Sequence, residues 1–309
     1  MSATPRAVFA GVATEDAIAV VDRYPGADER TVARHLIFGG GGPAATAAVA
    51  AARLGIPSAV VAAVGDDEAG DLVRRRLADE GVDVSGIRTV PGAATSRSVV
   101  VISGPERSRA IVNQVGPALE LDDALLAQLD GAEWLHVDQH GWPAVQARRG
   151  LLPAGLRLSV DAGNAIPGLT LEDTDLYVPT MAAIQQRYAG FSARALMQAA
   201  LDEGARTVVV TDGGAGSYGL RADGEYAAVM PPRAEIVSTL GAGDVFHGAL
   251  VAGLIHASEG AIAPGLESVV AYATTAATLS CRGIDGRSAI PTHDENLHHL
   301  AEKHLTTGR

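Results

Sequence analysis

The sequence predicts an α/β fold, a three-layer sandwich whose mostly parallel sheet is covered by helices on both faces, with a small β-sheet inserted beside it. Apolar runs of strand length alternate with runs of helical length along most of the 309 residues, as in proteins built from βαβ units. The strand-length runs are apolar throughout, which is typical of parallel strands buried on both faces. Two other stretches alternate polar and apolar residues, and they predict the small sheet.

The alternation of strands and helices can be followed from the first strand onward. The helix Ala44–Leu54 begins after Pro43 and ends before Gly55, residue types that are favoured at those two positions. Similar pairs of apolar strand and glycine-terminated helix then recur. In order, the other expected elements are the strands Val8–Val12 and Ser58–Val64, the helix Asp67–Glu80, the connector Val82–Ile87, the strands Trp134–Val137, Leu156–Asp161 and Leu176–Val178, the helix Ala193–Glu203, the strands Thr207–Thr211 and Ala234–Val237, and the helix Val245–Ile255.

The stretches Ala17–Phe38 and Thr95–Val115 lack long helical periodicity. Their alternating pattern fits half-exposed antiparallel strands better. We expect residues 15–38 and 95–115 to form a lid over a cleft, inserted in a single domain that spans residues 1–309. The alternative is that these strands extend an edge of the main sheet.

Composition argues against several classes of function. Lys and Arg total 24 against 36 Asp and Glu, a formal charge of −12, which argues against nucleic acid or another polyanion as a partner. The single cysteine, Cys281, excludes an intramolecular disulfide, suits a reducing compartment and is expected to be a small buried side chain. No segment reaches about 18 consecutive apolar residues, and Met1–Arg6 lacks the pattern of a signal peptide. We therefore expect a soluble cytoplasmic protein with no membrane partner.

The most informative motif is the turn Ser238–Gly248, with the sequence Ser-Thr-Leu-Gly-Ala-Gly-Asp-Val-Phe-His-Gly. A helix should begin there, so the amides of Gly241, Ala242 and Gly243 can bind an anion such as a phosphate. Asp244 would be repelled by that phosphate unless it accepts a proton from a hydroxyl nucleophile or holds a cation. The alternative is that Asp244 is an N-cap residue, which the helix dipole also favours.

A second glycine-rich loop, Gly39–Pro43, leads directly into the alanine-rich helix. Four consecutive glycines lose much backbone entropy on folding and need a reason, such as the close approach of a ligand. No G-x-G-x-x-G fingerprint follows the first strand, and neither loop ends in the Lys-Ser or Lys-Thr of a P-loop. A nucleotide-dependent oxidoreductase is therefore poorly supported, and a P-loop enzyme is excluded.

Five ordered motifs make the chain resemble the ribokinase-like carbohydrate kinases of the PfkB family. The motifs are Gly11 with Asp16, Gly41-Gly42 with the helix that ends at Gly55, Gly65–Gly70, Thr211–Gly216, and Ser238–Asp244. The last is similar to the family's Asp-Thr-x-Gly-Ala-Gly-Asp, with Ser238 in place of the first Asp. The resemblance covers most of the chain and implies a ribokinase-like fold and a carbohydrate kinase that uses ATP and Mg²⁺.

The resemblance also implies roles for single residues. Asp244 is expected to be the catalytic base that takes the proton of the sugar hydroxyl, while the amides of Gly241, Ala242 and Gly243 stabilise the transferred phosphoryl group. Asp16 is expected to bind a pair of sugar hydroxyls. The matching positions assign the sugar to Asp16, Gly41 and Gly42, and the nucleotide with its magnesium to Asp161, Asn164, Thr211, Gly213, Gly216, Thr239, Gly241 and Gly243.

Two departures from the family pattern concern the metal and the sugar. The family's Asn-x-x-Glu, which helps to organise magnesium-bound water, should fall near Pro179–Ala183, where neither side chain is present. No residue is therefore assigned as a metal ligand, and ATP phosphates and water are expected to hold the Mg²⁺. The asparagine that is common beyond the glycine pair is Thr46 here, which predicts a sugar-hydroxyl pattern different from that of ribokinase.

The segments Gly41–Gly55 and Gly241–Leu250 are similar to the bacterial 6-deoxy-6-sulfofructose kinases, which phosphorylate the C1 hydroxyl of a sulfonated ketose during sulfoquinovose breakdown. A sulfonate needs fixed cationic or amide donors, and the resemblance suggests four side chains near it. These candidates are Arg30, Asn113, Gln139 and His140. The arginine that those kinases carry near the last two positions is missing, and for Arg30 and His140 a purely structural role is the alternative.

We therefore expect an ATP-dependent sugar kinase with 6-deoxy-6-sulfofructose as the leading substrate and its 1-phosphate as the product. Fructokinase, ketohexokinase or ribokinase activity is the alternative. A non-catalytic sensor of a sugar or nucleotide is an alternative of another class, although a sensor has little use for Asp244. An apolar lid sheet is commonly buried against its twin in this family, so a homodimer through the lid is expected.

Overall fold

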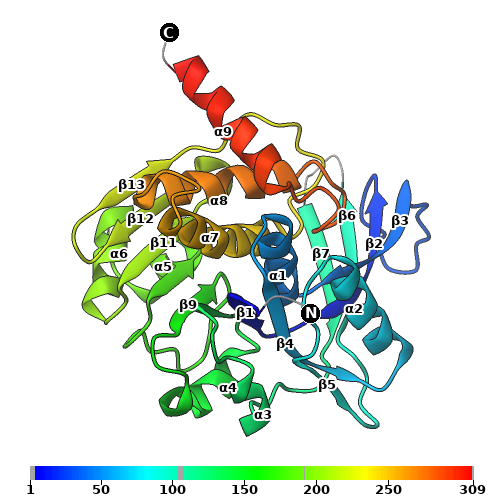
Figure 1. The fold of residues 1–309 in the computed structure, drawn as a ribbon. Coiled ribbons are helices and arrows are strands. Elements are labelled where there is room, and N and C mark those ends of the chain that lie inside the picture. The colour runs from blue at the N-terminus through cyan, green and yellow to red at the C-terminus, as the bar shows by residue number, and fades with distance from the viewer. Residues whose placement is uncertain (1–3, 104–107, 191, 308–309) are drawn as a thin grey trace.

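A large sheet with helices on both faces and a smaller sheet beside it make up the fold of this computed structural model, which describes residues 4–103, 108–190 and 192–307 (Figure 1). Among these residues the large sheet has nine strands in the order β13-β12-β11-β10-β9-β8-β1-β4-β5. The strands are β1 (Ala7–Ala10), β4 (Ser58–Gly65), β5 (Ile87–Val90), β8 (Trp134–Val137), β9 (Arg157–Ala162), β10 (Leu176–Pro179), β11 (Thr207–Thr211), β12 (Ser217–Arg221) and β13 (Tyr226–Val229).

The strand order of the large sheet reverses at β1. The strands from β11 across to β5 are parallel, and only β12 and β13 join by antiparallel pairs. Chain order runs outward from β1 through β4 to β5 on one side, and from β8 through β9, β10 and β11 on the other. In such sheets ligands bind beyond the carboxyl ends of the strands at the point where the order reverses.

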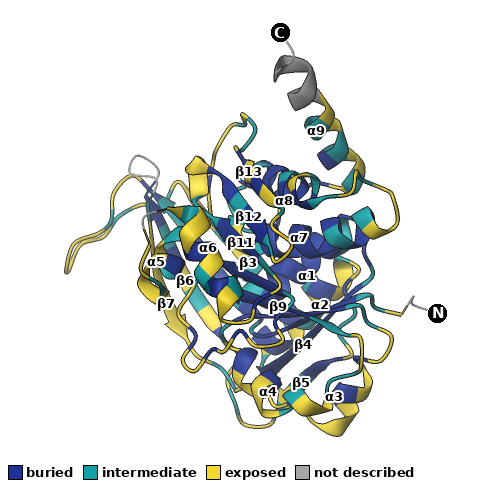
Figure 2. Cartoon of the chain, turned by 90° about the vertical axis from the view of Figure 1, so that its left-hand side faces the viewer, coloured by how far each residue is buried: buried dark blue, intermediate teal, exposed yellow. Residues whose placement is uncertain are grey.

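Helices cover both faces of the large sheet, as predicted, and the sheet between them is largely buried (Figure 2). Because successive strand residues point to opposite faces, Val208 and Val210 pack in one buried cluster and Val209 packs in the other. One face carries α1 (Pro43–Arg53), α2 (Glu68–Asp79), α7 (Ala242–Ser258), α8 (Leu266–Ser280) and α9 (His293–Thr307), and the other carries α3 (Asp123–Ala127), α4 (Trp142–Ala147), α5 (Met181–Arg187) and α6 (Ala193–Asp202). Short 3₁₀ turns lie at Arg149–Leu151 and Gly213–Ala215.

Small residues let α1 and α7 pack very closely. Every residue from Ala44 to Ala51 is buried, and a β-carbon at Gly248 of α7 would overlap the carbonyl oxygen of Ala47. The two glycine-rich loops lead directly into these two helices. Close packing of α1 against α7 therefore brings the loop at 39–42 next to the turn at 238–244.

The smaller sheet, named the lid after its predicted role, is separate from the main one, so its strands do not extend an edge of the large sheet. It contains β2 (Thr14–Val21), β3 (His35–Gly41), β6 (Arg97–Ser103) and β7 (Ser108–Gln114) in the order β3-β2-β6-β7. Its outer pairs are antiparallel as expected, but β2 and β6 are parallel, because a whole βαβ passage of the main domain separates them in the chain. The predicted lid residues 104–107 lie outside the described residues.

The apolar run Ala234–Val237 is not a strand, contrary to the prediction. Its residues Ile236 and Val237 are 37% and 49% exposed. The amides of Val237 and Ser238 donate to the carbonyl oxygen of Cys281 instead of a strand partner, so the segment is tied to the end of α8. The edge strand β5 was not predicted. The described residues contain no helix that is long and apolar enough to cross a membrane.

Candidate active site

The glycine turn that begins α7 is the centre of the candidate site. Gly241 is the N-cap residue of α7, and its φ of 74° lies in the left-handed region, which glycine adopts without strain. A β-carbon at Gly241 would also lie 2.7 Å from Gly286 Cα. The position therefore requires glycine both for its backbone conformation and for the space beside the segment around Gly286.

Asp244 lies in the first turn of α7 but does not cap the helix. The N-terminus of α7 has no side-chain cap hydrogen bond, so the interpretation of Asp244 as an N-cap residue is wrong. Among the three amides predicted to bind phosphate, that of Ala242 already donates to the Thr239 carbonyl oxygen at 3.3 Å. The amides of Gly241 and Gly243 have no backbone acceptor among the described residues, and they can donate to a ligand.

The Asp244 carboxylate is surrounded by charges but accepts no hydrogen bond from a residue that the structure describes. Burial raises its pKa to about 7, with a further increase from the negative charge of Asp161, while His247 and Arg287 act in the opposite direction. A carboxylate with a pKa near neutrality is an effective general base, because it is partly ionised at neutral pH and still binds a proton well. Among groups in a cleft, such a shift is typical of a functional residue.

Asp16 lies on β2, where the lid meets the glycine loop. The residue is 8% exposed, and the hydroxyl of Thr14 donates to its Oδ1 at 2.7 Å. Burial raises the pKa of Asp16. A β-carbon at Gly41 would overlap the Asp16 carboxylate, so the glycine provides the room in which this carboxylate lies beside the loop.

Asn113 shares one face of the lid with Asp16. Asp16 pairs with Ser98 on β6, and Ser98 pairs with Asn113 on β7, and side chains at paired positions lie on the same face of a sheet. Two of the predicted sugar contacts are therefore on one side of the lid. Arg30 lies instead in the exposed connection between β2 and β3, and it forms no ion pair with the described residues.

Asp138 is a buried residue of the site that the sequence analysis missed. Its two oxygens accept hydrogen bonds from four backbone amides, those of Val12, Ala44, His140 and Gly141, at 2.8 to 3.2 Å. Asp138 thereby holds together the ends of β1 and β8 and the start of α1. It also explains Gly11, because a β-carbon there would overlap the Asp138 side chain.

Arg287 is the second residue that the sequence analysis missed. Its buried guanidinium donates to the Gly41 carbonyl oxygen at 2.7 Å and to Thr46 Oγ1 at 3.2 Å. Thr46, one of the residues predicted to bind the sugar, therefore accepts a hydrogen bond from Arg287. Burial lowers the pKa of Arg287 to about 10, while the charges of Asp16 and Asp244 act to raise it. The two glycine-rich loops thus share one buried cation.

Gln139, His140 and Asn164 lie together beyond the ends of β8 and β9. The amide nitrogen of Asn164 donates to Gln139 Oε1 at 3.2 Å, and Gln139 Nε2 lies 3.3 Å from His140 Nε2. His140 and Asn164 are exposed. Residues that the sequence assigned to the sugar and to the nucleotide therefore form one polar group beyond the ends of these two strands.

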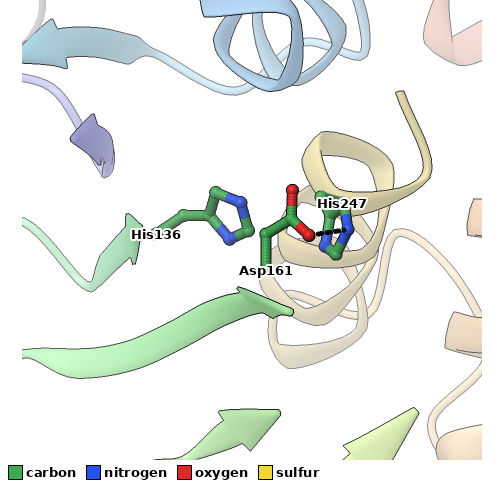
Figure 3. A group of neighbouring side chains, drawn as sticks. All are labelled: His136, Asp161 and His247. Atoms are coloured by element: carbon green, nitrogen blue, oxygen red, sulfur yellow. Dashed lines mark ion pairs between the residues drawn. The ribbon is translucent and has the colours of Figure 1, made fainter. Parts of the chain in front are cut away.

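Asp161 at the end of β9 forms an ion pair with His247 of α7. His247 Nε2 lies 3.1 Å from Asp161 Oδ1, and both side chains are almost fully buried (Figure 3). Burial alone would raise the pKa of Asp161, but His247 outweighs it and lowers that pKa to about 2. Burial likewise opposes the charged form of His247, yet Asp161 raises the histidine pKa. Asp161 is among the residues predicted from the sequence, whereas His247 is not.

The predicted nucleotide residues form two groups. Thr211 ends β11, and the turn after it is closed by a hydrogen bond of 2.8 Å from the Asp212 amide to the Gly216 carbonyl oxygen. Gly213 and Gly216 have φ values of 51° and 106°, in the region that favours glycine. Thr239 lies in the turn before α7, where Arg109 of the lid donates to its hydroxyl at 3.4 Å.

Residues that the family pattern would place near magnesium are absent from the segment after β10. Thr180 caps α5 by accepting a hydrogen bond of 3.2 Å from the Ala183 amide. The segment 179–183 has no carboxylate. The Thr180 side chain therefore caps α5, and the Asn-x-x-Glu of the family is absent here, as the sequence indicates.

Comparisons with known proteins agree with this arrangement. A family model described as "pfkB family carbohydrate kinase" matches residues 5–158 and 184–293. The chain is 30% identical over 311 residues to an ATP-dependent ribose-1-phosphate kinase of Halopiger xanaduensis, and the match covers 96% of this chain and 99% of that protein.

Solved structures show the same fold. The ribokinase of Arabidopsis thaliana complexed with ribose and ATP superposes with a TM-score of 0.82 at 23% identity, covering 96% of this chain and 99% of the other. A ribokinase II structure from Escherichia coli in complex with ATP and Mg²⁺ gives a TM-score of 0.80 at 22% identity, with the same two coverages.

Proposed function

The chain belongs to the pfkB family of carbohydrate kinases, and from this we propose that Asp244 is the base of a sugar phosphorylation by MgATP. The observation that carries the proposal is the convergence of two glycine-rich loops on Arg287. Arg287 bonds the Gly41 carbonyl oxygen, and its pKa responds to both Asp16 and Asp244. A sugar held at Asp16 would therefore lie close to the base and to the free amides of the α7 turn.

The proton transfer follows from the state of Asp244. Its pKa of about 7 leaves much of the carboxylate ionised at neutral pH, so it can take the proton as the sugar hydroxyl attacks the γ-phosphate. The amides of Gly241 and Gly243 then donate to the phosphoryl oxygens, where negative charge is held in the transition state. Bound Mg²⁺ supplies neutralisation of the phosphate charge.

The sugar side is assigned to Asp16, Gly41, Gly42 and Asn113. Asp16 offers two acceptor oxygens for a pair of hydroxyls, and Asn113 lies on the same face of the lid. Thr46 joins this group through its hydrogen bond to Arg287. The polar group of Gln139, His140 and Asn164 would border the substrate where β8 and β9 end.

The nucleotide side is assigned to the turn after β11 and to the turn before α7. The glycine turn after Thr211 lacks side chains at Gly213 and Gly216 and so leaves room for a nucleotide, and Thr239 is assigned to the phosphates because it directly precedes the α7 turn. The amides that stay free at Gly241 and Gly243 fit a phosphate at the N-terminus of a long helix. Asp161 and Asn164, at the end of β9, are placed for the triphosphate and its magnesium-bound water.

For the substrate we propose an anionic sugar, with 6-deoxy-6-sulfofructose phosphorylated at C1 as the leading candidate. Asn113 and the cation of Arg109, both on β7 and on the same face of the lid as Asp16, supply donors for a sulfonate. Ribose 1-phosphate is the second candidate, because the H. xanaduensis relative is named for it. Fructose, ribose and other uncharged sugars are the alternatives.

We further propose that two copies of the chain associate through the outer face of the lid. Phe38, Ala17, Val99 and Val112 form one row across the four strands, on the side opposite Asp16 because neighbouring strand residues alternate. Phe38 is 64% exposed and Val112 is 72% exposed. An apolar row of this kind is typical of an interaction surface, and a second lid is its natural complement.

A substrate screen with a matched inactive variant tests the proposal. Wild type and Asp244→Ala are assayed with MgATP against sulfofructose, ribose 1-phosphate, fructose 6-phosphate, fructose and ribose. We expect turnover of an anionic sugar by the wild type and its loss in the variant. Equal activity of the two proteins would refute the mechanism, and a preference for an uncharged sugar would refute only the proposed substrate. Sugar or ATP binding without turnover of any sugar would favour a sensor.

A further inference from the structure

A compact group of three buried side chains lies behind the base. His136 on β8, Asp161 at the end of β9 and His247 on α7 each offer a ligand atom within 4.8 Å of the others. The residues are 1%, 5% and 6% exposed. Figure 3 shows the two imidazole rings on either side of the Asp161 carboxylate. Three separate elements of the fold therefore bring these groups together.

Two nitrogens of this group have no partner. His136 Nε2 and His247 Nδ1 are buried and form no hydrogen bond within the described residues. Such groups cost free energy unless something satisfies them. The ion pair between His247 and Asp161 uses His247 Nε2, the nitrogen that would face a shared ion, so His136 Nε2 is the unpartnered atom that indicates a missing ligand.

His136 is arranged as a neutral ligand. Its Nδ1 lies 2.9 Å from Ser159 Oγ, and donation from Nδ1 to that hydroxyl leaves a bare lone pair on Nε2. Histidines that bind metals are commonly held in this way by a hydrogen bond at the other ring nitrogen. Protonation does not relieve the lone pair, because burial and the nearby His247 keep the pKa of His136 at about 3.

We propose that His136, Asp161 and His247 form a binding site for a transition-metal dication of the zinc class. Two imidazoles and one carboxylate suit Zn²⁺, Co²⁺ or Ni²⁺, whereas Mg²⁺ prefers oxygen ligands and keeps its water. Donors bound to one tetrahedral zinc lie roughly 3 to 3.5 Å apart. Asp161 Oδ1 and His247 Nε2 already lie 3.1 Å apart, and one ligand atom of each of the three residues lies within 4.8 Å of the others.

The ion would replace the proton that joins His247 to Asp161. Binding therefore releases a proton and becomes weaker as the pH falls. The site differs from the proposed MgATP site in its ligands, because two of its three donors are imidazoles. It shares only Asp161 with the proposed nucleotide residues. A bound ion would place a fixed positive charge close to Asp244. Kinase activity would then depend on the concentration of this metal.

Cobalt binding to the purified protein tests the proposal without ATP or sugar. Chelator-treated protein is dialysed against Co²⁺ in excess Mg²⁺, and stoichiometry and visible absorption are measured. We expect one Co²⁺ per chain with the intense bands of a tetrahedral ion, and displacement by Zn²⁺. His136→Ala and His247→Asn should each weaken binding at least tenfold. Ser159→Ala, which removes only the support of His136, should weaken it less.

Surface histidines provide the controls. His140→Ala at the mouth of the site and the double change of His298 and His299 to Ala on α9 should leave binding unchanged. Loss of binding in either control, or no stoichiometric Co²⁺ in the wild type, would overturn the proposal. Should a buried variant fail to fold, anomalous X-ray scattering from Zn²⁺-soaked wild-type crystals decides the matter, since an ion anywhere else contradicts the assignment.

Discussion

Replacement of Asp244 by Asn should abolish catalysis and at the same time stabilise the fold. Asn keeps the shape of the side chain but cannot accept the proton of a hydroxyl. Loss of a general base typically lowers kcat by about 100- to 10,000-fold. The wild-type rate should rise with pH up to the pKa of Asp244, about 7, and then level off, because the base acts in its ionised form.

The gain in stability follows from the same pKa. Burial and Asp161 raise the pKa of Asp244 from 3.8 to about 7 on folding, so the folded protein holds a proton that the unfolded chain releases. Ionisation of Asp244 leaves the free energy of unfolding unchanged below pH 3.8. It lowers that free energy progressively as the pH rises, and by its full amount above pH 7. About three pKa units correspond to roughly 4 kcal/mol. Asp244→Asn removes this cost, which at pH 5 is only roughly 1.5 kcal/mol.

Urea unfolding of both proteins at pH 5 and pH 8 measures the effect. We expect the variant to exceed the wild type in free energy of unfolding by up to about 4 kcal/mol at pH 8 and by much less at pH 5. Asp130→Asn, an exposed carboxylate in the turn after α3, is the matched control and should change neither activity nor stability. A gain that is absent at pH 8, or equal at both pH values, would refute the reasoning.

Three further outcomes are expected. Gly41→Ala should raise the KM for sugar at least tenfold while ATP binding stays intact, because its β-carbon would overlap Asp16; calorimetry with an ATP analogue separates the two, and unchanged sugar kinetics would contradict the placement of Asp16. Arg287→Lys should lower kcat/KM at least tenfold, since an ammonium cannot donate as a guanidinium does to Gly41 and Thr46 together; activity like that of the wild type would remove Arg287 from the site. Val112→Asp should convert the proposed dimer to a monomer in light scattering, and a wild type that is already monomeric at micromolar concentration would dismiss the lid interface.

The elements that the sequence predicted well carry their signals locally. Helix α1 was expected at Ala44–Leu54 and lies at Pro43–Arg53, because its proline and glycine boundaries act on neighbouring backbone. The run Ala234–Val237 has the apolar pattern of a strand. The Val237 amide, however, donates to the carbonyl oxygen of Cys281, which lies more than forty positions further along the chain. A local pattern cannot report a partner that only the tertiary fold supplies.

The same reason explains which site residues the sequence missed. Asp244, Asp16 and the glycines lie in motifs that can be recognised in order along the chain. Asp138 and Arg287 stand in no such motif, and their roles depend on loops that are distant in sequence. Arg287 bonds a residue 246 positions away. A weak signal exists in the Asp-Gly turn before Arg287, but nothing local indicates that the side chain turns inward to Gly41.

The way in which each carboxylate of the site is compensated explains why Asp244 is the one able to act as a base. Asp138 is held by four backbone amides, and Asp161 is paired with His247. Asp16 accepts from Thr14 and lies close to the charge of Arg287. Asp244 alone among these four accepts no hydrogen bond from the described residues. Because no such bond lowers its pKa, Asp244 can accept the proton of the substrate hydroxyl.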